Sequence, residues 1–199
     1  MSVNPPNYRE TVFQHQDLTK TSGNPTYKSL AHLERQCKAN AQSVLSTIGN
    51  GNLGYLGLVS SALAYERSSP GVPFVRPILP VLPDLTNSTA AQITEAHRLF
   101  AEQTSTFNAC NQIERTIIQQ ISTALDDDCL ADLINEDTGH IQGSVPEIFP
   151  DLYWTFGAIT PQSLPKAKAF WDQSFHDHPK PLPHAFPAPA RFSHQPTTP

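Results

Sequence analysis

An all-α fold is predicted by three observations. Apolar residues recur at steps of mostly three and four over 27–48 and over 93–125, and this spacing places them along one face of a helix. Two capping boxes, Thr89–Gln92 and Ser144–Glu147, mark helix starts. The prolines, 19 of 199 residues, gather mainly in two segments, which leaves the blocks between them able to form helices around one core.

Residues 1–23 are polar, contain Pro5-Pro6 and show no sustained period, so we expect a flexible N-terminal arm. The first helix should begin after the N-cap Thr26, because a threonine hydroxyl accepts a hydrogen bond from the free amides of a first turn. It should continue to the glycine loop that begins at Gly49. Its predicted buried face consists of Tyr27, Leu30, Leu33, Cys37, Ala41, Val44, Leu45 and Ile48.

Four glycines follow this helix, Gly49, Gly51, Gly54 and Gly57, and the first three match the G-x-G-x-x-G pattern of dinucleotide-binding sites. That pattern cradles phosphate only between a strand and a helix, whereas a helical stretch precedes it here. No Gly-Lys-Ser/Thr sequence occurs in the chain. We therefore interpret the loop as a helix C-cap and chain reversal, in which glycine adopts a positive φ at low cost.

No other pattern indicates chemistry. Asp126-Asp-Asp128 is a carboxylate cluster, but three consecutive acids on a helix point in three directions and cannot converge on one metal ion. The sequence also has no matching set of nucleophile, base and metal ligands. We expect the chain not to be an enzyme, with no catalytic residue, no cofactor and no metal.

Pro77, Pro80 and Pro83 recur at every third residue and would line one edge of a polyproline II helix. Two interpretations are open. In the favoured one, the segment is an extended connector whose side chains pack over neighbouring helices, because they are too apolar for an exposed ligand. In the alternative, the prolines and Arg76 form a ligand for an SH3- or WW-type groove. The apolar side chains concerned are Phe74, Val75, Ile78, Leu79, Val81 and Leu82.

Thr89 is expected to begin the longest helix, which would continue for about 36 residues and span about 54 Å. A compact domain of this size does not need such a length. The helix should therefore either bend near Thr104-Ser-Thr106, where hydroxyls compete for backbone hydrogen bonds, or project into a partner. Its predicted apolar face consists of Ile93, Phe100, Thr104, Phe107, Cys110, Ile113, Ile117, Ile121 and Leu125.

Shorter helices are expected after it. One covers 129–134, and the three aspartates before it should cap it through the helix dipole. Another begins behind Ser144 and contains Pro150, where proline removes a hydrogen bond beyond the first turn. A further start lies at Thr160-Pro161, and the Pro/His-rich tail 173–199 is expected to be disordered. The buried face of the second helix should be Ile148, Phe149, Leu152, Tyr153 and Phe156.

Composition limits the class of protein. The net charge of −5 excludes a strongly basic nucleic-acid surface on the body of the chain. Cys37, Cys110 and Cys129 are scattered, which argues against a disulfide framework and indicates a reducing compartment. The N-terminus lacks a signal peptide's apolar region, and no run approaches the roughly 18 apolar residues of a membrane span. We expect a cytoplasmic protein without membrane contact.

Taken in order, several segments of the chain resemble the N-terminal part of the Gag-like polyprotein of copia-type LTR retrotransposons. The similarity covers about residues 24–164. Asn52 and Tyr55 stand where the family's loop usually has histidines, and the Pro/His tail after Asp172 indicates a truncated or frame-shifted copy. The similar segments are Asn24-Pro-Thr-Tyr27, Ser46–Val59 with its glycine loop, Pro73-Phe-Val75 with the three prolines, Thr89-Ala-Ala-Gln-Ile93, Cys110-Asn-x-Ile-Glu114 and Leu152-Tyr-x-x-Phe-Gly-x-Ile-Thr-Pro161.

The resemblance implies an all-helical, non-enzymatic capsid-type subunit that associates with itself, with at most weak contact to element RNA. Residues 24–172 would then form one Gag-like domain. The alternative function is an adaptor that presents Pro77, Pro80 and Pro83 to SH3- or WW-type partners. The residues assigned to structure and assembly are Tyr27, Leu30, Leu33, Gly49, Gly51, Gly54, Gly57, Phe100, Phe107, Ile113, Tyr153 and Phe156.

Overall fold

The computed structural model describes residues 7–157, and this part of the chain is all-α, as predicted. Its one β feature is an isolated bridge between Ile134 and Ile141. The helix expected at Thr160-Pro161, the tail 173–199 and the predicted domain end at 172 lie outside the described residues. The α-helices are α1 (Tyr8–Thr11), α2 (Tyr27–Ser43), α3 (Ala62–Ser68), α4 (Ala90–Ala124), α5 (Asp127–Leu130) and α6 (Val145–Phe156), and the 3₁₀ turns are η1 (Gly51–Leu53), η2 (Leu56–Leu58) and η3 (Ala131–Leu133).

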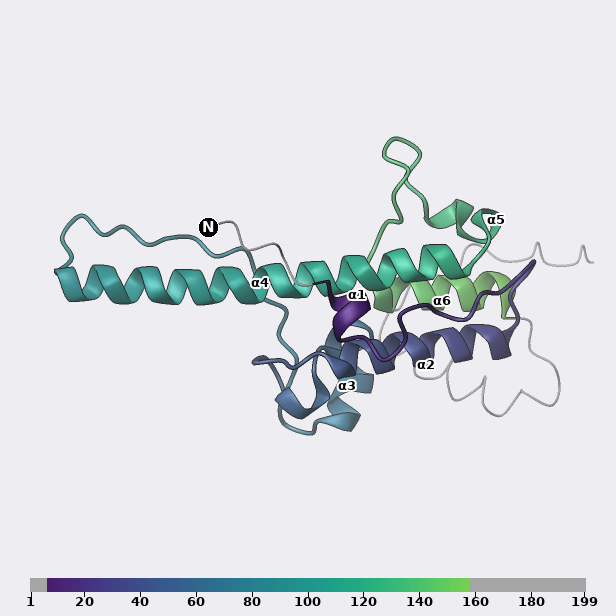
Figure 1. The fold of residues 1–199 in the computed structure, drawn as a ribbon, viewed down its shortest axis with the longest axis horizontal. Helices are drawn as coiled ribbons and strands as arrows, with labels where there is room; N and C mark the ends of the chain where they lie inside the picture. Colours follow the sequence, from purple (N-terminus) through teal and green to yellow (C-terminus); the bar gives the residue numbers. More distant parts are fainter. Residues whose placement is uncertain (1–6, 158–199) are drawn as a thin grey trace, which may run out of the picture.

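The core lies where α2, α6 and the C-terminal half of α4 pack together (Figure 1). Each helix contributes one apolar face, as the spacing of its residues predicts. At the edge of this core the rings of Tyr27 and Tyr153 lie 5.2 Å apart, and the Tyr153 hydroxyl donates to Glu34 Oε2 at 3.0 Å. Burial raises the pKa of Tyr153. The most deeply buried core side chains include Leu30, Leu33, Ile113, Ile117, Ile121, Ile148 and Leu152.

The N-terminal segment is packed onto this body, so the prediction of a flexible arm is wrong for residues 7–23. Phe13 and Leu18 are buried in the core. Asn40 on α2 accepts from the His15 amide at 2.7 Å and donates to the His15 carbonyl at 2.9 Å. Gln120 on α4 donates to the same carbonyl at 2.9 Å. Two buried amide side chains therefore hold a polar segment in place, because they replace the hydrogen bonds that water would supply.

Helix α2 begins as predicted and ends earlier than predicted. Thr26 and Ser29 form a capping box, in which the Thr26 amide donates to Ser29 Oγ at 2.9 Å. The helix ends at Ser43, and Leu45 is 92% exposed although it was assigned to the buried face. The chain then turns back, and the amide of Tyr55 donates to the Ala41 carbonyl at 2.9 Å. Gly54 and Tyr55 therefore lie against the last turn of α2, although they follow its end by more than ten residues in the chain.

Helix α6 continues through Pro150 to Phe156. Its start is confirmed, since Glu147 accepts a hydrogen bond from the Ser144 amide at 2.7 Å. Pro150 lies one turn after Pro146 and cannot donate to that residue's carbonyl. Burial of Ile148, Phe149 and Leu152 on the helix's inner face offsets the missing bond.

Replacing Pro150 by alanine should therefore stabilise the fold. We expect the free energy of unfolding to rise by about 1–2 kcal/mol, because the missing hydrogen bond is restored and a backward clash is removed. The matched control is Pro146→Ala, which removes a proline from the first turn, where no intrahelical bond is lost. Urea melts of both variants give the comparison. Equal effects of the two substitutions would contradict the prediction.

Candidate interaction surface

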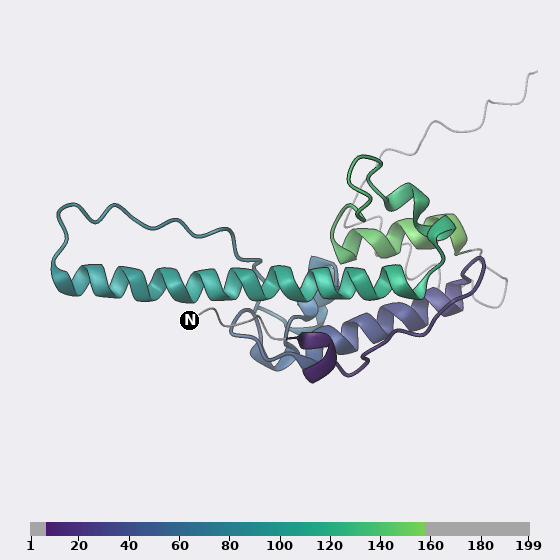
Figure 2. The same cartoon turned by 45° about the horizontal axis from the view of Figure 1, so that its top comes forward.

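The long helix projects from the body of the molecule (Figures 1 and 2). Of the outcome that its length predicts, projection into a partner, the projection is confirmed and the partner stays a prediction. All of its fully buried side chains lie at or after Cys110. Figures 1 and 2 show its N-terminal half extending beyond the other helices, with the extended segment that precedes it running back alongside. We call residues 72–89 the connector, and the connector together with residues 90–109 of α4 the arm.

No bend interrupts the arm at Thr104-Ser-Thr106. The Thr104 hydroxyl donates to the Phe100 carbonyl at 2.7 Å, and the Thr106 hydroxyl donates to the Glu102 carbonyl at 3.0 Å. Both hydroxyls therefore bond to a carbonyl one turn back, and α4 keeps its direction in both views (Figures 1 and 2). The capping box at Thr89 is also confirmed, with the Thr89 amide donating to Gln92 Oε1 at 2.9 Å. The helix is one continuous element of 35 residues.

The outer side of the connector is an exposed apolar ridge. The favoured interpretation, that the apolar side chains of this segment pack over neighbouring elements, is confirmed for Phe74 and wrong for the other five. Pro77 and Pro80 are half-buried, whereas the residues between and beside them face solvent. In an extended segment with three residues per turn, every third residue takes the same side. Pro77 and Pro80 occupy the half-buried side, towards α4, and the apolar pairs are left outside, whereas Pro83 is exposed. The ridge consists of Val75 (68% exposed), Ile78 (85%), Leu79 (66%), Val81 (84%) and Leu82 (39%).

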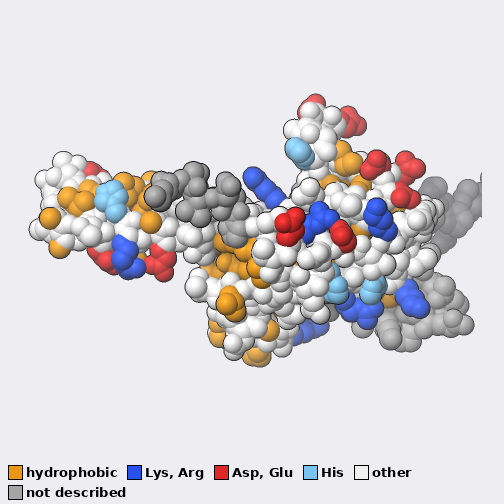
Figure 3. All heavy atoms as spheres, viewed as in Figure 1, with side chains coloured by type: hydrophobic (Ala, Val, Ile, Leu, Met, Phe, Trp, Pro, Cys, Tyr) orange, Lys and Arg blue, Asp and Glu red, His pale blue; other side chains and the backbone are white. Residues whose placement is uncertain are grey.

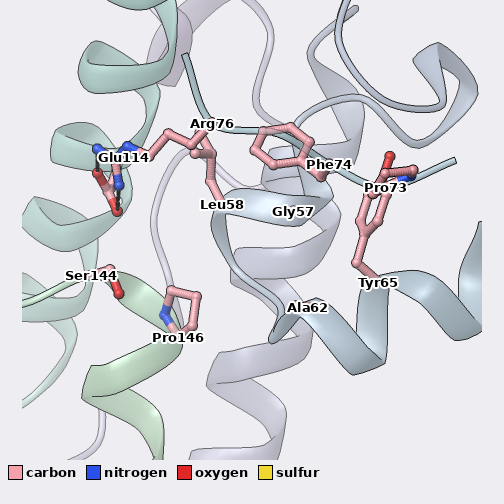
Figure 4. A pocket seen from close by; sticks show the side chains of 10 residues that line it. All are labelled: Gly57, Leu58, Ala62, Tyr65, Pro73, Phe74, Arg76, Glu114, Ser144 and Pro146. Atoms are coloured by element: carbon pink, nitrogen blue, oxygen red, sulfur yellow. Dashed lines mark hydrogen bonds and ion pairs between the residues drawn. The ribbon is translucent and has the colours of Figure 1, made fainter. Parts of the chain in front are cut away.

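The base of the connector is fastened to the body at two points (Figure 4). The ring of Phe74 meets that of Tyr65 edge-on at 5.6 Å. Arg76 forms a two-pronged ion pair with Glu114 on α4, one contact being 3.1 Å between Nη1 and Oε1. Arg76 also donates to Asn111 Oδ1 at 3.2 Å. A pocket of about 230 Å³ lies between these contacts and the start of α6.

The glycine loop forms the other side of this joint. A side chain at Gly57 would overlap the ring of Phe74, and one at Gly49 would lie 2.6 Å from the Tyr65 hydroxyl. A Cβ added at Gly51 would lie 2.9 Å from the Ser46 carbonyl oxygen. Several loop amides donate hydrogen bonds within the chain. The Asn50 amide donates to Tyr65 Oη and the Tyr55 amide to the Ala41 carbonyl, and those of Leu53 and Gly54 donate to the carbonyls of Asn50 and Gly51. The geometry is that of a packed joint and agrees with the interpretation of the loop as a chain reversal. The other part of that interpretation, a helix C-cap, is wrong, because α2 ends at Ser43 with Val44 as its C-cap.

The predicted structure and assembly residues fall into three places. Leu30, Leu33, Ile113 and Tyr153 are buried in the core, and Tyr27 and Phe156 are packed at its edge. The four glycines form the joint, and Phe100 and Phe107 lie half-buried on the arm. The structure does not bring these three groups together into one site. The ridge residues were predicted to be packed and were not among the predicted site residues. The spacing of the prolines was the signal for their exposure, because every third residue of such a segment takes the same side.

The arginine on the helix of the arm is paired with two glutamates of the same helix. Arg98 pairs with Glu95 at 2.8 Å and with Glu102 at 3.1 Å, and its hydrogen bond to Glu95 lowers the pKa of that carboxyl. Figure 3 shows hydrophobic side chains gathered over the outer part of the arm, with charged groups along one edge. Between residues 7 and 157, no group of three or more His, Cys, Asp or Glu side chains could hold a metal ion. Within the same range, no helix has the length and apolar character to cross a membrane.

Comparisons with protein-family models, with curated proteins and with solved structures find no match to this chain.

Proposed function

We propose that this chain is a non-enzymatic structural protein of the Gag-like type that associates with copies of itself through the arm. One observation carries the proposal. Of the ten large hydrophobic side chains that are exposed in the described part of the chain, seven lie on the arm, between Val72 and Leu99. Exposed apolar side chains gathered on one projecting element indicate an interaction surface, because their contact with water is unfavourable and association removes it.

The rest of the chain supports the same proposal. The helical core, the glycine joint and the long helix follow in the order that the resemblance to copia-type Gag-like proteins implies. The described arm has Arg76 and Arg98 as its cations, and both are paired with carboxylates, so it offers little attraction to RNA phosphates. We therefore propose protein association in the cytoplasm as the main activity, with weak RNA contact at most. An SH3- or WW-type partner is less well supported, since Pro77 and Pro80, which such a groove would contact, are half-buried.

The proposal predicts that the full chain forms concentration-dependent oligomers, which sedimentation velocity from low to high micromolar concentration will detect. Leu79→Asp should weaken this association at least about tenfold, because a charge must then be buried in an apolar contact. Leu45→Asp is the matched control, since Leu45 is 92% exposed and lies off the arm; it should leave association unchanged. A monomer at every concentration would refute the proposal.

A further inference from the structure

The exposed ridge of the connector has a two-fold symmetric pattern. Its centre is the peptide bond between Ile78 and Leu79, two aliphatic residues. The next residue outwards is a proline on each side, Pro77 and Pro80. Two positions beyond each proline there is an aliphatic residue, Val75 on one side and Leu82 on the other. The pattern of buried and exposed residues in 75–82 is symmetric about the same centre. The two prolines are half-buried, and the other six residues of 75–82 are exposed.

We propose that this ridge binds the same ridge of a second copy of the chain, antiparallel, about a two-fold axis between Ile78 and Leu79. In that register Ile78 contacts Leu79 of the other copy, and Val75 contacts Leu82. The inference rests on the proposed function and adds its partner and its register. A two-fold interface uses one patch on both subunits, so the patch must be complementary to itself when reversed, and residues 75–82 meet that condition.

The charges of the ridge allow this pairing. Arg76 is the one charged residue in 75–82, and its guanidinium is already paired with Glu114 of its own chain. The axis would place it opposite Val81, so the two copies bring no like charges together. The ridge therefore has no free charge with which to bind an acidic or basic partner. A second apolar ridge does not need one.

The backbone of the connector is also suited to such a contact. Residues 75–82 make no backbone–backbone hydrogen bond within the described chain. The prolines, which have no amide hydrogen, lie on the half-buried side, so the residues that face a second copy retain their donors. Eight extended residues give an overlap of about 25 Å.

Cysteine cross-linking of the full chain tests the register. Two copies of residue 78 would be neighbours across the axis, so Ile78→Cys should form a disulfide-linked dimer on mild oxidation. Two copies of residue 75, or of residue 82, would lie about 22 Å apart, beyond the roughly 7 Å that a disulfide can span between Cα atoms. Val75→Cys and Leu82→Cys should each remain unlinked, and a mixture of the two should form the mixed dimer.

The unmodified chain is the background control. Its Cys37, Cys110 and Cys129 are buried, and burial raises the pKa of the Cys110 thiol to about 11, so little thiolate is present at neutral pH. Efficient linking of Val75→Cys or Leu82→Cys alone would show parallel pairing and overturn the inference. Absence of all linking, in a chain that still oligomerises, would overturn it and leave the proposed function standing. A chain that stays monomeric would overturn both.

Discussion

Gly54→Ala is expected to lower the free energy of unfolding by about 3 kcal/mol or more. Gly54 has a φ of +53°, which is unfavourable for any residue with a Cβ. An added Cβ would lie 2.7 Å from the Gln42 carbonyl and 2.8 Å from the Ala41 carbonyl, and closer still to that of Val44. All three acceptors belong to the backbone at the end of α2, and they cannot move without breaking the contact between the loop and that helix.

A control measures the cost of a positive φ without a close contact. Gly71 has a φ of +74°, and a Cβ there would meet nothing within 4 Å. Gly71→Ala should therefore report the cost of the left-handed backbone alone, about 1 kcal/mol. The difference between the two variants, measured as a shift in the urea midpoint at constant m-value, is the energy of the close approach to α2 together with the cost of Gly54's ψ of −130°, which lies outside the left-handed well. Equal losses would show that the loop does not pack against the helix end.

Asn40→Ala is expected to lower the free energy of unfolding by about 2–4 kcal/mol. The side chain of Asn40 is fully buried. It accepts from the His15 amide at 2.7 Å and donates to the His15 carbonyl and to Gln120 Oε1, both at 2.9 Å. Alanine would leave a buried amide and a buried Gln120 oxygen with fewer partners and would leave a small cavity, and each change opposes folding.

A double-mutant cycle with Gln120→Ala measures the coupling. Because the two side chains bond each other and the same His15 carbonyl, we expect an interaction energy of at least about 1 kcal/mol. Gln119→Ala, on the exposed neighbouring position, should change stability by less than about 0.5 kcal/mol. Limited proteolysis should also begin to cleave residues 7–23 in Asn40→Ala. Additive losses with an unchanged digestion pattern would contradict the network.

Much of the fold could be predicted because its signals are local. The capping residues Thr26, Thr89 and Ser144 define helix starts through bonds made within one turn, and the periodic apolar residues of α4 and α6 define their inner faces. The end of α2 could not be predicted in this way. Leu45 and Ile48 continue the helical period, but the helix stops at Ser43, where the returning glycine loop takes its place.

The candidate surface was predicted only in part. The length of α4 indicated a projecting helix, and the spacing of Pro77 and Pro80 indicated that one side of the connector differs from the other. Hydrophobic character alone then suggested that the ridge is buried. It is exposed, because Pro77 and Pro80 take the half-buried side, towards α4, and the arm extends beyond the other helices (Figure 1).

The sequence by itself determined the helical class, the helix starts and the turn-forming glycines, since these depend on groups within a few residues of one another. Only the tertiary structure decided that residues 7–23 are held by Asn40 and Gln120, that Gly54 covers the end of α2, and that the connector's apolar residues face outwards. Each of these depends on contacts between parts distant in the chain, and neither a propensity nor a period contains that information.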